Sequence, residues 1–406
     1  MLDIRITSST PVLPDRPAIQ EFIDLLGADR WAARVRSIER RGTLGPRAGK
    51  AILQRHAVEC ALERLRRGIR TSTVAERHIG TLAAEAVALA ESLSAAGRAC
   101  FVTQLRHALD DDHTLVLPFH VLRTALIHRA RGFEVHFAGW EDGASFDLLL
   151  RREAAEAELA CDVMSAEEGR SVHRSAWFRL ADRIDPDLQT WLRAHPGRYL
   201  LKMTLPEGLR ADNVSDIALA DLHARIRRLL HESRRADHDE ALVLRLDPLL
   251  LAGAQADDAG IVPRLRQEFG PEAQLSVVTD ERGVFVVAAR AGREDEIAAA
   301  IRRRLAVVAP SRLTGTRPGI LAMFVDDVDR AEWRGLRERL ELEGETRQFL
   351  TFPEARAVVA VTCTSRMELF GITGPDAAPD GELRFRNPAH PAARSAALAP
   401  AVISSL

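Results

Sequence analysis

The amino-acid sequence predicts an α/β (α+β) protein with a helical N-terminal region, an α/β core and a C-terminal α/β domain. Apolar residues recur every three to four positions over residues 15–130, which is the period of helices. From "FEVHFAG" at residue 133 the pattern changes to short alternating segments, which is typical of strands. Over residues 239–372 strand-like and helix-like segments alternate, and this favours a further α/β domain.

These patterns divide the chain into five expected parts. A helical, basic domain covers residues 1–114, and the α/β core covers 115–210. A connecting helix covers 211–238, and the C-terminal α/β domain covers 239–372. The tail, 373–406, carries clusters of Pro, Ala and Asp, and we expect it to be loop or disorder.

Breaker residues separate the expected helices of the first part. The helical pattern that begins near residue 16 is interrupted by "TLGPRAG", and the next one stops near Gly68. The alanine-rich segment 72–109 is predicted to form two helices, which part near "SAAGRA". Leu117-Pro118 then opens a further helix that ends at Gly132.

Three short strands follow, at 133–139, 145–151 and 155–163. The segment 165–184 has the helical period again, and "RYLLKMTLP" at 198–206 reads as a buried strand. We expect all of these elements, between Pro118 and Pro206, to form a single sheet with its helices.

Composition excludes few classes of function. The formal net charge of the chain is −2, with 46% hydrophobic and 28% charged residues, as in ordinary globular proteins. Four widely spaced cysteines are expected to be reduced thiols. The N-terminus has no basic stretch followed by an apolar one, and no apolar run approaches the length of a membrane span. We therefore expect a cytoplasmic protein with no membrane partner.

Positive charge is concentrated in residues 30–70, which hold 12 basic and 3 acidic residues, a net of +9. Such a segment can face nucleic acid, since phosphate contacts release counterions. The alternative is a solvated helix face that pairs with acids elsewhere in the fold. Of the 56 basic residues only Lys50 and Lys202 are lysines, so a lysine inside an apolar strand is conspicuous.

The order helix–strand–strand–strand–helix–strand is accompanied by local motifs. Asp147 opens the second strand, and "GR" at 169–170 and "HR" at 173–174 follow the third. Residues 115–206 thereby resemble the PD-(D/E)XK nuclease superfamily (restriction-endonuclease-like fold). They are most similar to bacterial proteins whose third strand reads Glu-Cys-Lys. The resemblance implies a phosphodiesterase in which an Asp and a Glu hold Mg²⁺ and a Lys positions the attacking water.

Only part of that site is present in the sequence. Asp147 stands where the resemblance places the metal-binding Asp, but Ala160-Cys161-Asp162 stands where Glu-Cys-Lys is expected. The preceding helix often supplies a further Glu in the family, yet residues 118–131 contain no acid. The chain therefore resembles a degenerate member of the superfamily.

A rebuilt site is the alternative. Side chains two apart in a strand share a face, so Glu158 and Asp162 point the same way and can join Asp147 around Mg²⁺. Lys202, on the strand expected next in the same sheet, would then assist catalysis. The other interpretation makes Glu158 part of a solvated hairpin face, Asp162 a helix cap and Lys202 an edge residue.

The resemblance also implies that a basic helix face formed by Arg170, His173 and Arg174 approaches phosphate. The alternative is that these residues pair with nearby acids. His120 and His128, two helical turns apart, are interpreted as packing or surface residues and not as a metal pair. Asp326-Asp327 is interpreted as a turn at a strand end.

Three functions remain open on the sequence alone. The first is a nuclease-fold protein that binds nucleic acid or a partner protein without efficient hydrolysis, with no cofactor. The second is an active Mg²⁺-dependent DNA or RNA nuclease that uses Asp147, Glu158, Asp162 and Lys202. The third is a structural or assembly scaffold.

Overall fold

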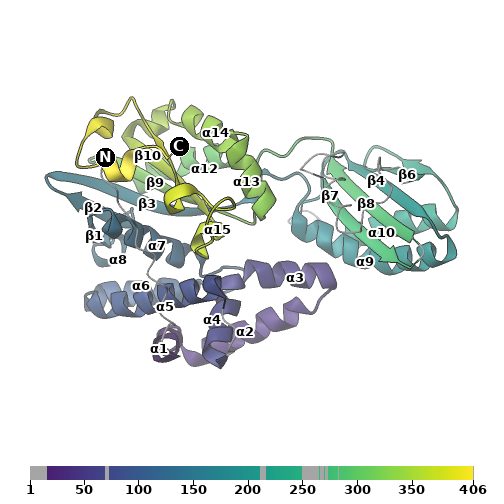
Figure 1. Cartoon of the computed structure of the whole chain (residues 1–406), viewed down its shortest axis with the longest axis horizontal. Helices are drawn as coiled ribbons and strands as arrows, with labels where there is room; N and C mark the ends of the chain where they lie inside the picture. The colour runs from purple at the N-terminus through teal and green to yellow at the C-terminus, as the bar shows by residue number, and fades with distance from the viewer. Residues whose placement is uncertain are drawn as a thin grey trace. The chain divides into compact units, whose positions relative to one another are not determined.

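The computed structural model describes residues 16–68, 73–210, 216–248, 265, 269, 273–281 and 283–405. The described residues form two compact units (Figure 1). The first unit draws on 1–39, 55–166 and 298–406, and the second on 40–54 and 167–297. Each unit is therefore assembled from segments that lie far apart in the sequence, and the five-part division expected from the sequence does not follow this assembly.

The N-terminal part of the chain is helical, as predicted. Thr73 caps the fifth helix in a capping box with Glu76, and Gly68 ends the fourth in the left-handed conformation. The two alanine-rich helices part at Leu93-Ser94, close to the predicted position. The helices are α1 (Arg16–Leu26), α2 (Ala28–Gly42), α3 (Pro46–Arg55), α4 (Ala57–Arg67), α5 (Val74–Ser92), α6 (Ala95–His107) and α7 (Val116–Ala130).

The first unit is built on a six-stranded sheet of order β1-β2-β3-β9-β10-β11. Its strands are β1 (Glu134–His136), β2 (Leu148–Arg152), β3 (Ala155–Ser165), β9 (Gly319–Asp326), β10 (Val358–Ser365) and β11 (Leu383–Arg386). The central strands β3, β9 and β10 run parallel, while β1, β2 and β11 pair antiparallel at the two sides. Every residue of β9 and β10 is buried, as expected for parallel strands covered on both faces.

Helices cover both faces of this sheet (Figure 1). One face packs on α7, α5 and α6 in a large apolar core, in which the rings of Phe22 and Phe119 meet edge to face at 5.7 Å. The other face is covered by α12 (Ile297–Arg312) and α14 (Glu341–Phe349), with α13 (Arg330–Glu338) between β9 and α14. Short helices α8 (Ala138–Glu141), α15 (Arg366–Leu369) and α16 (Ala399–Val402) complete the unit.

The expectation that residues 118–206 form a single sheet is wrong in its second half. The three strands β1, β2 and β3 pair as predicted, but β4 (Arg198–Leu205) belongs to the other sheet. The neighbour of β3 is β9, and the crossover helix that leads into β9 is α12. Two parallel strands must be joined by a crossover connection, but that connection can be long. Here the crossover between β3 and β9 contains the segment 167–297 of the second unit. Local sequence patterns do not reveal how long such a crossover is.

The tail 373–406 is ordered through residue 405, against the expectation of loop or disorder. β11 pairs with β10 from Ala360 to Cys363. The outer edge of β11 is covered in turn, because the Arg384 amide donates to Ser405 Oγ at 2.7 Å and the Ser405 amide donates to the Arg384 carbonyl at 3.2 Å. Covering a sheet edge removes a row of unpaired backbone groups, which gives these polar residues a structural use.

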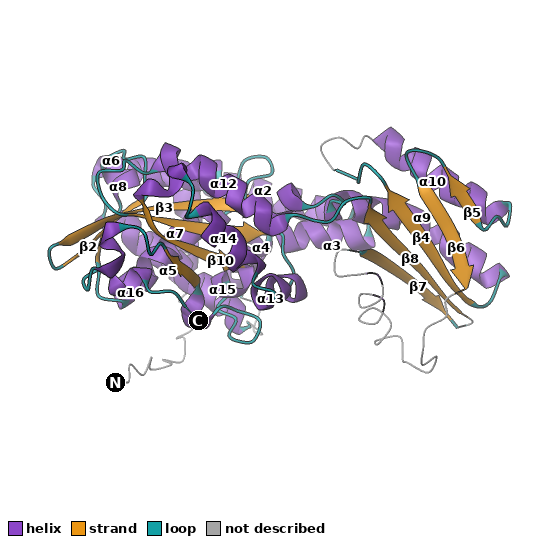
Figure 2. Cartoon of the chain, turned by 90° about the horizontal axis from the view of Figure 1, so that it is seen from above, coloured by secondary structure: helices purple, strands orange, loops and turns teal. Residues whose placement is uncertain are grey.

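The second unit is a five-stranded sheet of order β5-β6-β4-β8-β7 (Figure 2). The remaining strands are β5 (Ala236–His238), β6 (Val243–Pro248), β7 (Gln274–Asp280) and β8 (Gly283–Ala291). The helices α9 (Arg174–Ala194) and α10 (Asp216–His231) pack on one face around Trp177 and Phe285. The segment expected as a connecting helix is thus a core element of this unit. Among the described residues, no helix has the length and apolarity that crossing a membrane requires.

The segment 167–297 of the second unit begins and ends with stretches that meet at Gly169. The Glu296 amide donates to the Gly169 carbonyl at 2.7 Å, and the Ser171 amide donates to Asp295 Oδ1 at 2.9 Å. A Cβ atom on Gly169 would lie 2.4 Å from the Cα atom of Ile297. The glycine of the "GR" motif is therefore required by backbone packing.

We predict that Gly169→Ala destabilises the protein by about 2 kcal/mol, because backbone must shift to admit the methyl group. Urea unfolding followed by circular dichroism measures the change. The matched control is Gly344→Ala in α14, where a Cβ atom meets nothing within 4 Å. That variant should gain about 0.5–1 kcal/mol from helix propensity. Equal stability changes in the two variants would contradict the packing argument.

Candidate functional site

Asp147 lies immediately before β2, where its carboxylate is held by the neighbouring strand and by α12. Its backbone amide donates to the Leu159 carbonyl at 3.0 Å, which places the side chain beside β3. Asp147 Oδ2 accepts hydrogen bonds from the Cys161 amide at 2.7 Å and from Arg312 Nη2 at 2.8 Å. The predicted metal-binding Asp is thus in place, but an arginine of α12 already binds it.

Asp162, on β3, has a second arginine of the same helix as its partner. Arg304 Nε lies 2.5 Å from Asp162 Oδ2, and Arg304 Nη2 lies 3.0 Å from Oδ1. This two-point geometry is the strong form of an arginine–carboxylate pair. The guanidinium group of Arg304 therefore lies beside the strand position at which the resemblance expects a lysine.

Glu158 points to the same side of β3 as Asp162, as predicted from the strand period. Its carboxylate is fully buried and accepts hydrogen bonds from the Thr314 amide at 2.8 Å and from the Thr314 hydroxyl. Arg317 Nη1 lies 3.7 Å from Glu158 Oε1. Glu158 thus anchors the loop between α12 and β9, and the solvated-face interpretation of this residue is wrong.

These contacts do not fit a hard-cation site. In the described part of the chain, no three His, Cys, Asp or Glu side chains are grouped so that they could hold a metal ion. A metal bound by Asp147 and Asp162 would have to displace two guanidinium groups. A carboxylate that is already ion-paired is a poor ligand, because its negative charge is compensated.

Lys202 does not lie on a strand next to β3. It is on β4 in the second unit, where its Nζ atom is 3.5 Å from Asp247 Oδ2 and 5.5 Å from the centre of the Phe269 ring. The expectation that Lys202 lies in the same sheet as Asp147 is therefore wrong, because β4 belongs to the five-stranded sheet of the second unit.

Burial decides the protonation behaviour of Asp147. Loss of water raises the pKa of its carboxyl group, and the charge of Arg312 and the hydrogen bond from the Cys161 amide offset part of that rise. The Cys161 side chain faces the opposite side of β3, where it contacts Thr124 of α7. Burial raises the pKa of its thiol well above the ordinary value, which disfavours the reactive thiolate form.

Arg170, His173 and Arg174 do not share a helix face. The helix α9 begins only at Arg174, and the residues before it form a short 3₁₀ turn and an extended segment. Arg170 is fully buried and paired with Glu167, and the Arg174 amide donates to Glu167 Oε2 at 2.8 Å. Pairing with a nearby acid, the alternative weighed for these residues, is what the geometry favours. Contact of these residues with phosphate stays a prediction.

The carboxyl ends of the parallel strands gather further polar groups. Ser165 Oγ donates to Asp327 Oδ2 at 2.7 Å, and Arg55 Nη1 lies 3.4 Å from the same carboxylate. Asp326 is buried and paired with Arg366, whose Nε and Nη2 lie 2.5 Å and 3.0 Å from its two oxygens. The two aspartates do form the end of β9 and the bend after it, but they also hold arginines there. In α/β sheets this edge is the usual place for ligands.

The two histidines of α7 are packing residues. His120 is buried, and its Nε2 lies 3.0 Å from the Ala322 carbonyl oxygen. His128 is buried edge to face against Phe133, at 5.7 Å between ring centres. Burial lowers the pKa of each imidazole to about 4, so both are neutral at physiological pH. All four cysteines are free thiols.

Seven of the 12 basic residues of segment 30–70 are paired with carboxylates within the fold. Carboxylates pair with most of its arginines, and several of these acids come from outside the segment; Arg70 lies outside the described residues. The pairs are Arg30–Asp110, Arg34–Glu59, Arg47–Asp185, Arg55–Asp327, Arg64–Glu76, Arg66–Glu63 and Arg67–Glu63. This supports the interpretation of the segment as helix faces paired with acids elsewhere, and it weakens the case for a nucleic-acid surface there.

The residues missed by sequence reasoning are Arg304, Arg312 and Thr314. They belong to the run "RRRLAVVAPSRLTGTR", which contained no motif that the sequence analysis used. Their signal was indirect: Arg304 and Arg312 are two turns apart on the helix that precedes the fully apolar strand "GILAMFV". Such a strand must lie inside a parallel sheet, and the helix before it must cross that sheet.

We predict that Arg312→Gln destabilises the protein by about 1–3 kcal/mol at pH 8 and by less at pH 5. Without Arg312, the pKa of Asp147 in the folded state rises further above its unfolded value. An acid with a raised folded pKa loses folding stability as pH increases from the unfolded pKa through the folded one. Urea unfolding at the two pH values measures this. The double variant Asp147→Asn/Arg312→Gln should recover most of the loss, and equal losses at both pH values would contradict the assignment.

We further predict that Arg170→Ala lowers the free energy of unfolding by about 2–4 kcal/mol, because the change removes a buried guanidinium group and leaves Glu167 without that partner. Arg179→Ala is the control. Arg179 also belongs to the second unit, but it is partly exposed and 3.9 Å from Asp216, so its loss should cost under about 1 kcal/mol. An Arg170→Ala variant that kept full stability would argue against the buried structural role.

Comparison with known proteins assigns no family to this chain. No protein-family model matches it, and no curated protein or solved structure matches it either. What can be said of its chemistry therefore depends on strand order, burial and the contacts of the two aspartates with α12.

Proposed function

We propose that the first unit has a restriction-endonuclease-like core that binds a nucleic-acid backbone without hydrolysing it. The proposal is supported by the order of α7, β1, β2, β3, α12 and β9, which is the order that the sequence resemblance implies. On this interpretation the second unit is an insertion between the third strand of the core and its crossover helix. In this proposal α12 and β9 take the places of the helix and the fourth strand that the sequence analysis expected at 165–184 and 198–206.

One observation supports the proposed lack of hydrolysis. The two carboxylates that would bind a metal ion are already paired with arginines of α12. Arg312 binds Asp147, and Arg304 binds Asp162. A guanidinium group stays protonated at all physiological pH values, so it can neither act as a general base nor generate a metal-bound hydroxide. The arginines supply positive charge where the cations would lie, but not the chemistry of those cations.

The same arginines are the reason to expect phosphate contact. The side chains of Arg304, Arg312 and Arg317 keep 39%, 31% and 41% of their surface exposed, so each can reach solvent beside its carboxylate. Guanidinium groups bind phosphate in the two-point geometry that they use for carboxylate. Together with Arg151, these arginines balance four acids, Asp147, Glu156, Glu158 and Asp162, so this surface does not repel a polyanion as four unpaired acids would.

A scaffold function remains the second candidate, and the ion-paired state of segment 30–70 favours it. The two functions differ in a measurable way, because a scaffold has no affinity for nucleic acid at low salt.

The experiment combines a cleavage assay with a binding assay. We predict no cleavage of plasmid or single-stranded DNA or RNA with Mg²⁺ or Mn²⁺, and binding that weakens steeply between 50 and 200 mM salt, as expected for about two or three phosphate contacts. Arg304→Gln should weaken binding about tenfold and reduce the salt slope by roughly one contact. The control is Arg302→Gln on the same helix, which breaks a pair with Glu345 and should leave binding unchanged.

Each contrary result points to a different function. Cleavage that disappears in Asp147→Ala would establish an active nuclease and remove the non-hydrolytic proposal. No binding at 50 mM salt would favour the scaffold. Equal losses in the Arg304 and Arg302 variants would mean that nucleic acid binds somewhere other than this surface.

A further inference from the structure

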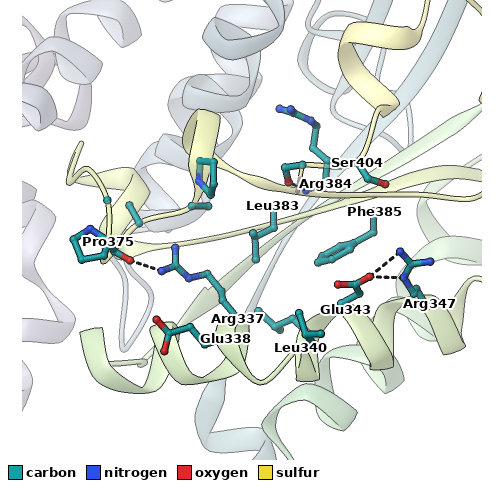
Figure 3. Close-up of a pocket in the computed structure, with 16 residues that line it drawn as sticks. Arg337, Glu338, Leu340, Glu343, Arg347, Pro375, Leu383, Arg384, Phe385 and Ser404 are labelled. Carbon is teal, nitrogen blue, oxygen red and sulfur yellow. Dashed lines mark hydrogen bonds and ion pairs between the residues drawn. The ribbon is translucent and has the colours of Figure 1, made fainter.

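A cavity of about 660 Å³ lies between β11, the α13–α14 pair and residues 374–379 (Figure 3). The cavity and Asp147 lie at opposite ends of the strand order. Asp147 precedes β2, and the strands β3, β9 and β10 lie between β2 and β11. Pockets that take small organic ligands have about this volume, roughly 300–1,000 Å³. The size of the cavity therefore suits a small ligand of up to about three rings.

The walls of the cavity are mainly apolar. Leu383 and Phe385 on β11 face Leu340 and the stem of Arg337 across it (Figure 3). Pro375, Ala377, Ala378 and Pro379 form a further apolar side. Such a surface gains free energy when it covers the apolar body of a ligand.

Leu340, which lines the cavity, has a strained backbone conformation. It links α13 to α14 with φ 58° and ψ 21°, the left-handed region that non-glycine residues avoid. Its side chain is 60% exposed, so burial within the chain does not repay the strain. A strained backbone that presents an exposed leucine beside a cavity is the kind of outlier from which a binding role can be inferred.

Arg337 supplies the polar group. Its guanidinium group donates to the Pro375 carbonyl, while its buried Nε finds no hydrogen-bond acceptor among the described residues. The other arginine on this side of the cavity, Arg347, is already held by Glu343 at 2.7 Å. The third arginine of the lining, Arg384, pairs with Asp380 at 3.1 Å, so Arg337 is the lining arginine that we expect a ligand anion to bind. A guanidinium group carries five N–H donors, so Arg337 can donate to the Pro375 carbonyl and still bind an anionic group in the cavity.

We propose that this cavity binds a small amphipathic anion. Its apolar ring or short chain packs between Leu340 and the β11 residues Leu383 and Phe385, and its single carboxylate, sulfonate or phosphate group accepts hydrogen bonds from Arg337. This site shares no residue with the Asp147–Arg312 surface, so it is independent of the proposed nucleic-acid binding and can stand or fall without it.

The test uses the full chain and two dyes that differ only in charge. 8-Anilinonaphthalene-1-sulfonate has an apolar body and one anionic group, and N-phenyl-1-naphthylamine has the same body without the anion. We expect saturable binding of one equivalent of the anionic dye, measured by fluorescence and calorimetry. Arg337→Gln should weaken it about tenfold and leave the neutral dye unaffected, because only the charged hydrogen bond is lost.

The variant Leu340→Gly tests the apolar contact with the ligand without destabilising the fold. Glycine tolerates the positive φ, so this variant should be at least as stable as the parent chain, yet it should weaken both dyes about fivefold through lost apolar contact. Arg339→Gln is the control, since Arg339 pairs with Glu341 and does not line the cavity. Dye binding that is absent, or that is unchanged in both the Arg337 and Leu340 variants, would overturn the proposal.

Discussion

The parallel pairing of β3 with β9 is the constraint on which the candidate site depends. It aligns Asp162 with Met323 and Ser165 with Asp326 in register, and it requires α12 to cross the sheet before β9 begins. The crossing carries Arg304 and Arg312 past the two aspartates of the β2–β3 edge. The same pairing makes residues 167–297 an insertion, because the chain must leave and re-enter the first unit between the two strands.

Ion pairs at this edge explain how a group of acids is tolerated without a metal. Partly buried carboxylates that face one another repel, and each would lose water without compensation. A guanidinium group beside each one restores the balance, while hydrogen bonds from the Cys161 amide and from Thr314 satisfy the remaining oxygens. The arrangement is locally complete, because each of these carboxylates already has a partner.

Two stretches singled out in the sequence have structural uses in the second unit. Gly169 permits the close crossing of the two boundary segments, and Arg170 is buried against Glu167 beside it. The "GPRAG" stretch opens α3, where the amides of Arg47 and Ala48 donate to the Asp182 carboxylate at 2.9–3.1 Å. A helix N-terminus can bind an anion, and here a side chain of the same unit is that anion.

By itself the sequence determined the local elements: the helices up to Ala130, the three strands that follow, the position of Asp147 at the start of β2 and the common direction of Glu158 and Asp162. These follow from short-range rules, namely residue period, breakers and the alternation of strand side chains. Only the tertiary structure decided which strand joins β3, which side chains neutralise the aspartates, and that Lys202 belongs to another sheet. Those contacts join residues more than a hundred positions apart, and hydrogen-bonding geometry places no limit on the length of chain between two parallel strands.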